Sequence, residues 1–435
     1  MSLQADMPQT SRGDIGFVEF VLMIAAMMAL GALGIDAMLP NIPAIGEALG
    51  VADENRRQLI ITAYLLGLGG AQLVFGPLAD RYGRKPVLLV GLGLYAGFSL
   101  IAAFSRSFEL LLAARVLQGV GAAATRAVPI SIVRDRFAGR EMARVMSLTS
   151  IVFMGAPILA PSLGQAVLML ASWPYLFGLL AALGAVVIVW AALRLPETLH
   201  PEDRLPIQPR RIFGSFATAM SDRTAICYTL AQTCLFGGIL GFINSSQQVF
   251  ADVFHAASLF PLVFAIAASF IALASLVNVR LVRGVGMRFL SHGALLGFLA
   301  IAAAHLFVAS RGAETLVIFA ALQAATMFCF GLTAGNFGAM AMEPMCHIAG
   351  VASAFQGFVS MVGASLIGYF IGQQFNGTVV PVEAGYLLCG LASLLAVLFA
   401  ERGRLFRPHQ PVELRRVVIK PPASAASPAS GCGTR

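Results

Sequence analysis

Long runs of apolar residues alternate with short polar stretches along most of the chain. Each run is close to the roughly 20 residues that an α-helix needs to cross the hydrocarbon core of a bilayer. This pattern predicts an all-α polytopic membrane protein with twelve transmembrane helices. The expected helices cover residues 17–39, 57–77, 86–105, 108–132, 146–169, 173–194, 224–248, 258–280, 288–309, 314–336, 350–375 and 384–400.

The longest polar connection, residues 195–223, divides these helices into two groups of six. It contains PETLHPEDRLPIQPRR, whose prolines and charges exclude a membrane span. We therefore expect two six-helix bundles, 17–194 and 224–400, joined by this linker. A short tail, 1–16, precedes them, and a tail rich in Pro, Ala and Ser, 401–435, is expected to be disordered.

Composition agrees with a membrane protein and argues against a soluble domain, a metal-binding or disulfide-rich protein and an enzyme. Hydrophobic residues make up 58% of the chain and charged residues 11%, against about 25% charged in soluble domains. The six cysteines form no CxxC and no Cys/His spacing, so they indicate neither a metal site nor a disulfide framework. The chain also shows no phosphate-binding loop and no nucleophile–base pair, which argues against an enzyme.

The distribution of basic residues predicts the orientation in the membrane. Most of the 29 Lys and Arg residues fall on the side that would hold both termini and the linker. The opposite side holds only Arg56, Arg57, Arg106 and Arg311. By the positive-inside rule the base-rich side is cytoplasmic, so both termini and the linker are expected there. The net charge of +8 is thus explained by topology and does not indicate nucleic-acid binding.

Between two predicted helices the chain reads GPLADRYGRKPVL, residues 76–88, with one acid and three bases within six residues. The acid is Asp80, and the bases are Arg81, Arg84 and Lys85. Glycines on both sides predict a tight reversal of the chain at the cytoplasmic face. Because these charges must be held by other groups, we interpret the hairpin as a conformational latch.

Few ionisable residues lie at membrane depth, where a charge costs at least about 2.5 kcal/mol. Asp36, near the outer end of the first helix, is interpreted either as a proton-titrating carboxylate or as a helix-end acid with local hydrogen bonds. Arg115 cannot shed its charge, so it must be neutralised by a partner or by backbone carbonyls. Gln118 lies one turn further along, and Gly119 permits close helix approach, which indicates a polar node between helices. Arg126 is expected in the cytoplasmic half, as a functional or a structural residue.

The fifth predicted helix carries Pro157 and Pro161 among small residues that include Gly164. A proline removes a backbone hydrogen bond and kinks a helix. This arrangement indicates either an ordinary packing kink or a helix that flexes at the interface between the two halves.

Polar and aromatic side chains are expected to line a cavity that suits amphipathic small molecules. The alternative for each of them is an interhelical hydrogen bond or a position facing lipid. The candidates are Tyr64, Phe153, Gln232, Phe242, Asn244, Asn336, Phe355, Gln356 and Phe358.

Several motifs resemble those of the major facilitator superfamily. GPLADRYGRKPVLL is similar to its signature between helices 2 and 3, and RVLQGVGAAATRAVPISIVRD resembles the helix-4 signature of its twelve-span drug:proton antiporters. GAPILAPSLGQ resembles their helix-5 signature, and GIDAMLPNIPAIGEALG their helix-1 signature. In the second half NVRLVRGVGMR resembles a decayed copy of the first hairpin, and HIAGVASAFQGFVSMVGASLIG is similar to helix 11 of the bicyclomycin/chloramphenicol-resistance (Bcr/CflA) branch.

The resemblance implies the major facilitator fold and roles for single residues. Asp36 matches the helix-1 acid, and Arg115, with Gln118 and Gly119, matches a helix-4 motif linked to proton coupling. Asp80 matches the hairpin acid, and the implied partners of this latch are Arg134, Arg136 and the N-terminus of the eleventh helix. The helix-5 signature is degraded, since Ala160 precedes Pro161 and Gln165 follows Gly164.

The function that follows is proton-coupled efflux of amphipathic small molecules or drugs across the bacterial inner membrane by alternating access. The alternative on the same fold is a proton symporter or a facilitator that imports a specific metabolite. A membrane enzyme or a sensor is the third hypothesis. We expect no cofactor, a proton gradient as the energy source, and a monomer whose partners are substrate, protons and lipid, with no nucleic acid.

Overall fold

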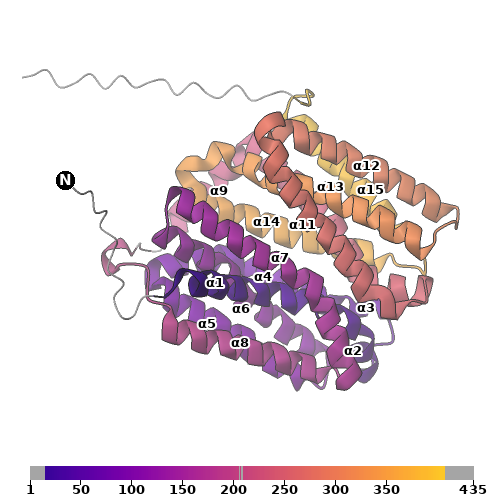
Figure 1. The fold of residues 1–435 in the computed structure, drawn as a ribbon, viewed down its shortest axis with the longest axis horizontal. Coiled ribbons are helices and arrows are strands. Elements are labelled where there is room, and N and C mark those ends of the chain that lie inside the picture. Colours follow the sequence, from indigo (N-terminus) through magenta and orange to yellow (C-terminus); the bar gives the residue numbers. More distant parts are fainter. Residues whose placement is uncertain (1–14, 205, 207–208, 407–435) are drawn as a thin grey trace, which may run out of the picture.

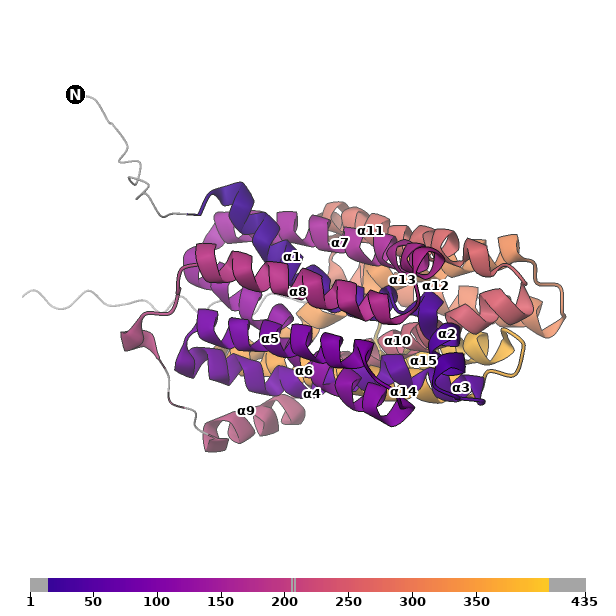
Figure 2. The same cartoon turned by 90° about the horizontal axis from the view of Figure 1, so that it is seen from below.

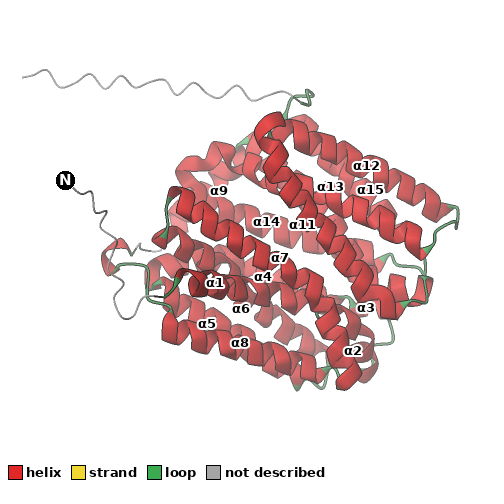
Figure 3. Cartoon of the chain, in the orientation of Figure 1, coloured by secondary structure: helices red, strands yellow, loops and turns green. Residues whose placement is uncertain are grey.

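The computed structural model describes residues 15–204, 206 and 209–406, and these are almost entirely helical, with no strand among them (Figures 1 and 3). The N-terminal half contains α1 (Phe17–Asp36), α2 (Ile42–Ala48), α3 (Glu54–Arg57), α4 (Leu59–Tyr82), α5 (Arg84–Ala103), α6 (Phe108–Arg136), α7 (Gly139–Leu170) and α8 (Pro174–Arg194). After α9 (Pro209–Ser221) the C-terminal half contains α10 (Arg223–Gln248), α11 (Phe260–Val285), α12 (Met287–Ser310), α13 (Leu316–Met342), α14 (Ala349–Gln373) and α15 (Val380–Ala400).

Twelve of the described helical segments are long and apolar enough to cross a membrane, six before α9 and six after it. The prediction of an all-α, twelve-span protein is therefore confirmed. Figure 1 shows the two bundles side by side, the first in indigo to magenta and the second in orange to yellow.

The helix bounds differ from the predicted ones where a helix end is not marked by apolar residues. The first span runs from Phe17 to Ala48, because α1 ends at Asp36 and the chain continues through a short 3-10 turn containing Pro40 into α2. Helix α7 begins at Gly139 instead of the expected residue 146. Part of the linker forms α9, which lies on the outside of the bundle against α10 and α14 (Figure 2).

Single glycines form the tightest connections between spans. Only Gly83 separates α4 from α5, and its φ of 104° lies in a region that favours glycine. Gly286, with a φ of 84°, joins α11 to α12 in the same way. We call the end of the bundle that carries these two turns and the linker the linker end, and the opposite end, with Gly50, Gly312 and Gly377, the loop end.

The halves meet along two helix pairs, α4 with α14 and α7 with α11. Small residues bring α4 and α14 close together: Gly69 faces Met361, and Gly357 faces the side chain of Gln72. Close packing of small residues is a common way for helices to associate in a bilayer. This interface surrounds the candidate site.

Candidate functional site

A cavity of about 350 Å³ lies between the two halves, and we call it the central cavity. Helices α1, α4, α6 and α7 contribute to its wall from one half, and α10, α11, α13 and α14 contribute from the other. Most of its wall is aliphatic or aromatic, and its volume is within the range of small-molecule sites. Its charged residues are Asp36 and Arg126.

Asp36 is the last residue of α1 and is 7% exposed, with its side chain in the wall of the central cavity. Among the described residues it forms no ion pair and no side-chain hydrogen bond. An unpaired carboxylate at membrane depth is costly. The role of Asp36 as a proton-titrating group stays a prediction.

Arg115 is completely buried beside the cavity and is satisfied by neutral groups. Its Nε donates to the carbonyl oxygen of Ile60 at 3.0 Å, its Nη2 to that of Gly34 at 2.8 Å, and its Nη1 to Oε1 of Gln118 at 2.6 Å. The guanidinium also lies over the ring of Tyr64, 4.4 Å from its centroid, in a cation–π contact. Arg115 thus ties α1, α4 and α6 together and forms no ion pair with Asp36.

Gln118 extends this polar node, since its Nε2 donates to Oγ of Ser99 at 2.6 Å. Gly119 faces α4 so closely that a Cβ atom there would overlap with the carbonyl oxygen of Tyr64. The helix-4 motif therefore places a buried cation, its amide acceptor and a backbone contact on one face of α6.

A second cavity, of about 460 Å³, lies nearer the linker end between α4, α6 and α14, and we call it the linker-end cavity. It shares Arg126, Phe236 and Met361 with the central cavity. Asp80 and Arg134 border it on one side, and Gly350 and Val351, at the start of α14, border it on the other. In this conformation a space therefore separates the hairpin acid from the N-terminus of α14.

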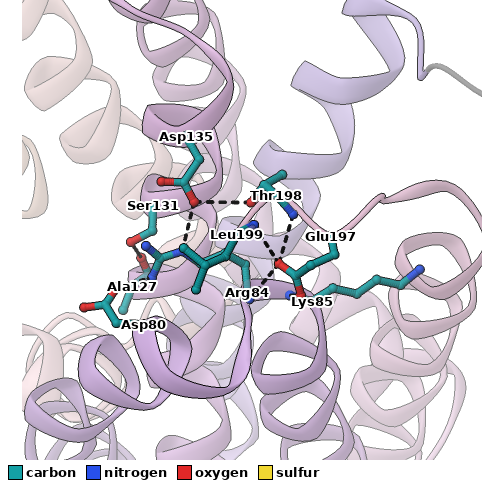
Figure 4. A network of polar contacts seen from close by, with 9 residues as sticks. All are labelled: Asp80, Arg84, Lys85, Ala127, Ser131, Asp135, Glu197, Thr198 and Leu199. Carbon is teal, nitrogen blue, oxygen red and sulfur yellow. Dashed lines mark hydrogen bonds and ion pairs between the residues drawn. The ribbon is translucent and has the colours of Figure 1, made fainter. Parts of the chain in front are cut away.

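Arg84 is the centre of the hairpin network (Figure 4). Its Nη1 donates to Oδ1 of Asp80 and its Nε donates to Oδ2 of Asp135 at 2.9 Å. The Arg84 side chain is 5% exposed, whereas that of Asp80 is 38% exposed. Asp80 is thus paired within its own hairpin.

Glu197 of the linker fixes the start of α5 (Figure 4). Its carboxylate accepts hydrogen bonds from the backbone N–H of Arg84 at 2.9 Å and from that of Lys85 at 3.2 Å. A carboxylate at this end of a helix interacts favourably with the helix dipole. The linker is thereby anchored to the hairpin.

The other basic residues of the predicted latch are spread around this network. Arg81 is exposed, and Nζ of Lys85 donates to the carbonyl oxygen of Ala192 at 2.8 Å. Arg134 lines the linker-end cavity, and Arg136 lies 5.1 Å from the ring centroid of Phe20. No ion pair joins Asp80 to Arg81, Lys85 or Arg134 among the described residues, and the latch roles of these three bases and of Arg136 stay predictions.

The helix-5 prolines lie inside α7, at the interface with α11. Pro157 lines the central cavity, and the carbonyl oxygen of Gly164 accepts a hydrogen bond from Nδ2 of Asn41 at 3.0 Å. A Cβ atom on Gly164 would overlap with the backbone of Ala37, so α7 lies directly against the end of α1. Pro161 lies between these two contacts, one turn after Pro157.

Four of the nine predicted cavity residues line the two cavities: Phe153 and Phe242 the central one, Gln232 and Gln356 the linker-end one. Nε2 of Gln356 donates to Oε1 of Gln232 at 3.0 Å.

The other five predicted cavity residues lie outside both cavities because they pack elsewhere. Tyr64 packs under Arg115, and Asn336 exchanges hydrogen bonds with Asn278. Phe355 lies against Phe216 of α9, and Asn244 is buried next to Gly372. Phe358 is partly buried on α14. Sequence alone does not give the rotation of a helix that is apolar all round.

Polar contacts between the halves at the loop end were not predicted. Nε2 of Gln58 donates to Oε1 of Gln248 at 2.6 Å and to the carbonyl oxygen of Gly372 at 3.1 Å. Nδ2 of Asn55 donates to the carbonyl oxygens of Gln373 at 3.2 Å and Phe375 at 3.0 Å. These uncharged residues join the halves at the end opposite the linker-end cavity.

A buried cluster in the C-terminal half was also missed. His305 lies between Glu314 and Glu383, with its Nδ1 2.8 Å from Oε2 of Glu383, and all three side chains are at most 5% exposed. Glu383 is in the first turn of α15, just before the start of the predicted helix at residue 384. This cluster lines neither of the two cavities.

Comparisons with known proteins agree with this architecture. The family described as Major Facilitator Superfamily matches residues 22–367. An uncharacterized MFS-type transporter, YdgK, of Bacillus subtilis is 31% identical over 87% of this chain and 94% of its own length.

Two relatives have names that refer to resistance. The bicyclomycin resistance protein homolog of Haemophilus influenzae is 26% identical, with 87% of this chain and 95% of that protein covered. The multidrug resistance protein MdtL of Shigella flexneri is 28% identical over 91% of this chain and 98% of its own length.

A solved structure, that of the human organic anion transporter MFSD10 (TETRAN), shares the fold. Its TM-score is 0.64 at 17% identity, and the match covers 89% of this chain and all of the other. Members of this family are lipid-embedded transporters of small molecules and are not enzymes. The twelve apolar spans and these relatives indicate a multi-pass protein of the bacterial inner membrane, and the chain belongs to the major facilitator superfamily.

Proposed function

We propose that this transporter exports amphipathic small molecules in exchange for protons. The observation that carries the proposal is Asp36, an unpaired and nearly buried carboxyl group in the wall of a largely apolar cavity between the two halves. A proton and a substrate that both need this carboxylate compete for it, and such competition is the basis of exchange. The names of the two resistance-related relatives agree with drug-like substrates.

Arg115 supports coupling between Asp36 and helix movement. It holds the carbonyl oxygen of Gly34, two residues before Asp36, and also contacts α4 and α6. A change in charge or ligand at Asp36 would therefore act on a rigid junction of three helices. We assign Arg115 to proton coupling as a positioning residue.

The arrangement of contacts between the halves supports alternating access. The polar contacts of Asn55 and Gln58 join the halves at the loop end, whereas the linker-end cavity separates Asp80 from the start of α14. We propose that the linker end, with its excess of basic residues, is cytoplasmic, so this conformation corresponds to an inward-facing state. In the outward-facing state the loop-end contacts break and Asp80 approaches α14, whose N-terminus favours a negative charge.

In this proposal the protein works as a monomer with the proton gradient as its energy source, and it needs no cofactor. An importing symporter on the same scaffold is the competing function. Two contacts of α7 support export: Pro157 lines the central cavity, and Gly164 packs against the end of α1. They place the segment that resembles the antiporter signature at the interface where the two halves must flex.

The test is transport in inverted membrane vesicles with an inward-directed proton pump active. Export predicts that substrate accumulates in the vesicles and that a protonophore abolishes the accumulation. Asp36→Asn should abolish the dependence on the gradient, while Glu47→Gln, at an exposed position on α2, serves as the matched acid control. Uptake by intact cells, with no accumulation in the vesicles, would instead establish import.

A further inference from the structure

Arg126 is a permanent charge in the centre of the protein that no described residue neutralises. It lies ten residues before the end of α6, which places it about 15 Å from the linker end of that helix, within a segment long and apolar enough to cross a membrane. It forms no ion pair or hydrogen bond among the described residues, and its exposed surface faces the two cavities, both of which it lines. A guanidinium keeps its charge there, so the group that pairs with it, or the water that solvates it, lies in the cavities.

Arg115 shows that an arginine on this helix can be satisfied by neutral groups of the protein. Arg115, three turns earlier on the same helix, has neutral acceptors for its Nε, Nη1 and Nη2 atoms. Arg126 has no such acceptor in the part of the chain that the structure describes, and it lies on α6 in the walls of both the central and the linker-end cavity.

The central cavity therefore offers one unpaired acid and one unpaired base, Asp36 and Arg126, which do not pair with each other. Between them the wall is aromatic and aliphatic, with Phe153, Phe236 and Phe264 among its residues. The other charges that border the connected cavities are Asp80, which is paired with Arg84, and Arg134. The hydroxyl of Tyr64, which acts electrostatically on Asp36, donates to the carbonyl oxygen of Gly31, and the guanidinium of Arg115 is held by the carbonyl oxygen of Gly34, two residues before Asp36.

We propose that the preferred cargo is an amphipathic zwitterion, whose anionic group pairs with Arg126 and whose ammonium group pairs with Asp36. This inference rests on the proposed exchange of substrate for protons and specifies its substrate class. The apolar body of such a molecule would lie against the aromatic wall, and its two charges would satisfy the two groups that the protein leaves unpaired.

The sign of the coupling distinguishes a zwitterion from simpler ions. A plain anion at Arg126 would favour the protonated form of Asp36, so anion and proton would travel together. A plain cation at Asp36 would displace the proton but would leave Arg126 uncompensated and be repelled by it. Only a molecule with both charges displaces the proton from Asp36 and also supplies the counter-ion of Arg126.

The test uses a matched set of four fluorescent ligands built on norfloxacin, which carries a secondary amine and a carboxylic acid. Its ethyl ester is a cation, its N-acetyl derivative is an anion, and the N-acetyl ethyl ester is neutral. Binding of each to the purified full-length protein is measured by fluorescence anisotropy at pH 7.5 without divalent cations. We expect norfloxacin to bind about tenfold more tightly than the ester or the N-acetyl derivative, since each change removes one charge-assisted contact.

The variants assign each preference to one residue. Arg126→Gln should remove the preference for the acid over its ester, and Arg126→Lys should retain part of it. Asp36→Asn should remove the preference for the amine over its N-acetyl form. Arg106→Gln, at an exposed site in the α5–α6 loop, is the matched arginine control and should change neither ratio.

Equal binding of the four ligands by the wild-type protein would overturn the proposal, and this comparison does not depend on how well any variant folds. An acid preference that survives Arg126→Gln would overturn the assignment to Arg126. Transport in inverted vesicles separates this inference from the proposed function. Charge-selective binding without gradient-driven accumulation would reject export but keep the proposed recognition of a zwitterion. Gradient-driven accumulation of all four ligands alike would support export but reject the recognition of a zwitterion.

Discussion

In the N-terminal half Gly83 turns α4 into α5, and the next residue, Arg84, is held by Asp80 on α4 and Asp135 at the end of α6. In the C-terminal half Gly286 turns α11 into α12, and Arg288 follows two residues later. Its Nη2 lies 3.3 Å from Oε2 of Glu343, which directly follows α13. Helices α11, α12 and α13 thus repeat the arrangement of α4, α5 and α6.

Each hairpin arginine pairs with two acids, and the two hairpins differ in where the second acid lies. Three residues before Gly83 the first hairpin has Asp80, which borders the linker-end cavity, whereas three residues before Gly286 the second has the exposed Arg283. Arg288 uses Glu401 instead, just after α15, with its Nε 2.8 Å from Oε1 of Glu401. Tyr228 donates to the same oxygen at 2.6 Å. The first hairpin thus keeps an acid at the interface between the halves, while the second uses its acid to fix the end of α15.

This difference suggests that one ancestral arrangement has been adapted for two purposes. An acid with 38% of its side chain exposed next to a cavity can change partner when the halves move. An acid that is 14% exposed and bonded to both Arg288 and Tyr228 cannot do so without breaking the packing of the C-terminal half. The comparison predicts movement at one hairpin and rigidity at the other.

The largest loss of stability is expected for Arg84→Gln. This change leaves the carboxylates of Asp80 and Asp135 without the cation that both of them bind. Removing one partner from a buried ion pair costs about 3–5 kcal/mol, and the exposure of Asp80 places this case near the lower value. We expect a lower Tm for the purified protein and reduced transport. Arg283→Gln, an exposed arginine of the second hairpin, should change stability by less than about 0.5 kcal/mol. A Tm for Arg84→Gln equal to that of this control would contradict the assigned role.

Arg288→Gln should destabilise the C-terminal half by a somewhat smaller amount, about 2–3 kcal/mol, because its contact with Glu343 is long. Unlike Arg84→Gln, it should leave turnover per folded molecule unchanged, since neither Glu343 nor Glu401 lines the two cavities. Tm and transport rate are measured on the same preparation, and the rate is normalised to folded protein. A reduced normalised rate would show that the second hairpin also moves during transport.

Asp80→Asn should lower the maximal transport rate at least about fivefold, the lower end of typical coupling between conformational states. Asparagine keeps a hydrogen-bond acceptor for Arg84 but loses the charge that α14 would attract. The substrate concentration at half-maximal rate should stay the same, because Asp80 does not line the central cavity. Glu343→Gln is the matched control in the second hairpin, and its maximal transport rate should equal that of the wild type. Weaker substrate binding at a normal rate would place Asp80 in the binding site instead.

The hairpins also show how much the sequence determines. Apolar run lengths predicted all twelve spans, because a bilayer requires a minimum length of apolar helix. The charged segment of residues 76–88 predicted a tight turn, and the resemblance of the second hairpin to the first could be read despite its changed charges. Which acids hold Arg84 and Arg288 could not be predicted, since Asp135, Glu197 and Glu401 are distant in sequence and their pairing depends on how the helices pack.

The cavity shows the same limit for side-chain orientation. Asp36 and Arg115 could be selected because charge at membrane depth is rare, whatever the helix rotation. The prediction for Tyr64 and Asn336 rests on residue type alone, and each packs against another polar residue. The sequence leaves Arg126 open between a functional and a structural role, because whether a charged side chain has a partner depends on the three-dimensional packing.

The smallest effect is expected for Glu401→Gln on thermal stability at low pH, and it tests the rigidity of the second hairpin. Burial would raise the pKa of Glu401, but hydrogen bonds from Tyr228 and Arg288 outweigh it and hold the pKa below the ordinary value of 4.5. A carboxyl group with a lowered pKa stabilises the folded state at pH values above its ordinary pKa, and this contribution is lost as the pH falls through the lowered value. Glu401→Gln removes the contribution at all pH values, at a cost of about 1 kcal/mol near neutrality. The Tm difference between wild type and Glu401→Gln should therefore be constant from pH 7 to about pH 5 and shrink below pH 4.5. A difference that does not change with pH would show that Glu401 holds Arg288 by packing and not by its charge.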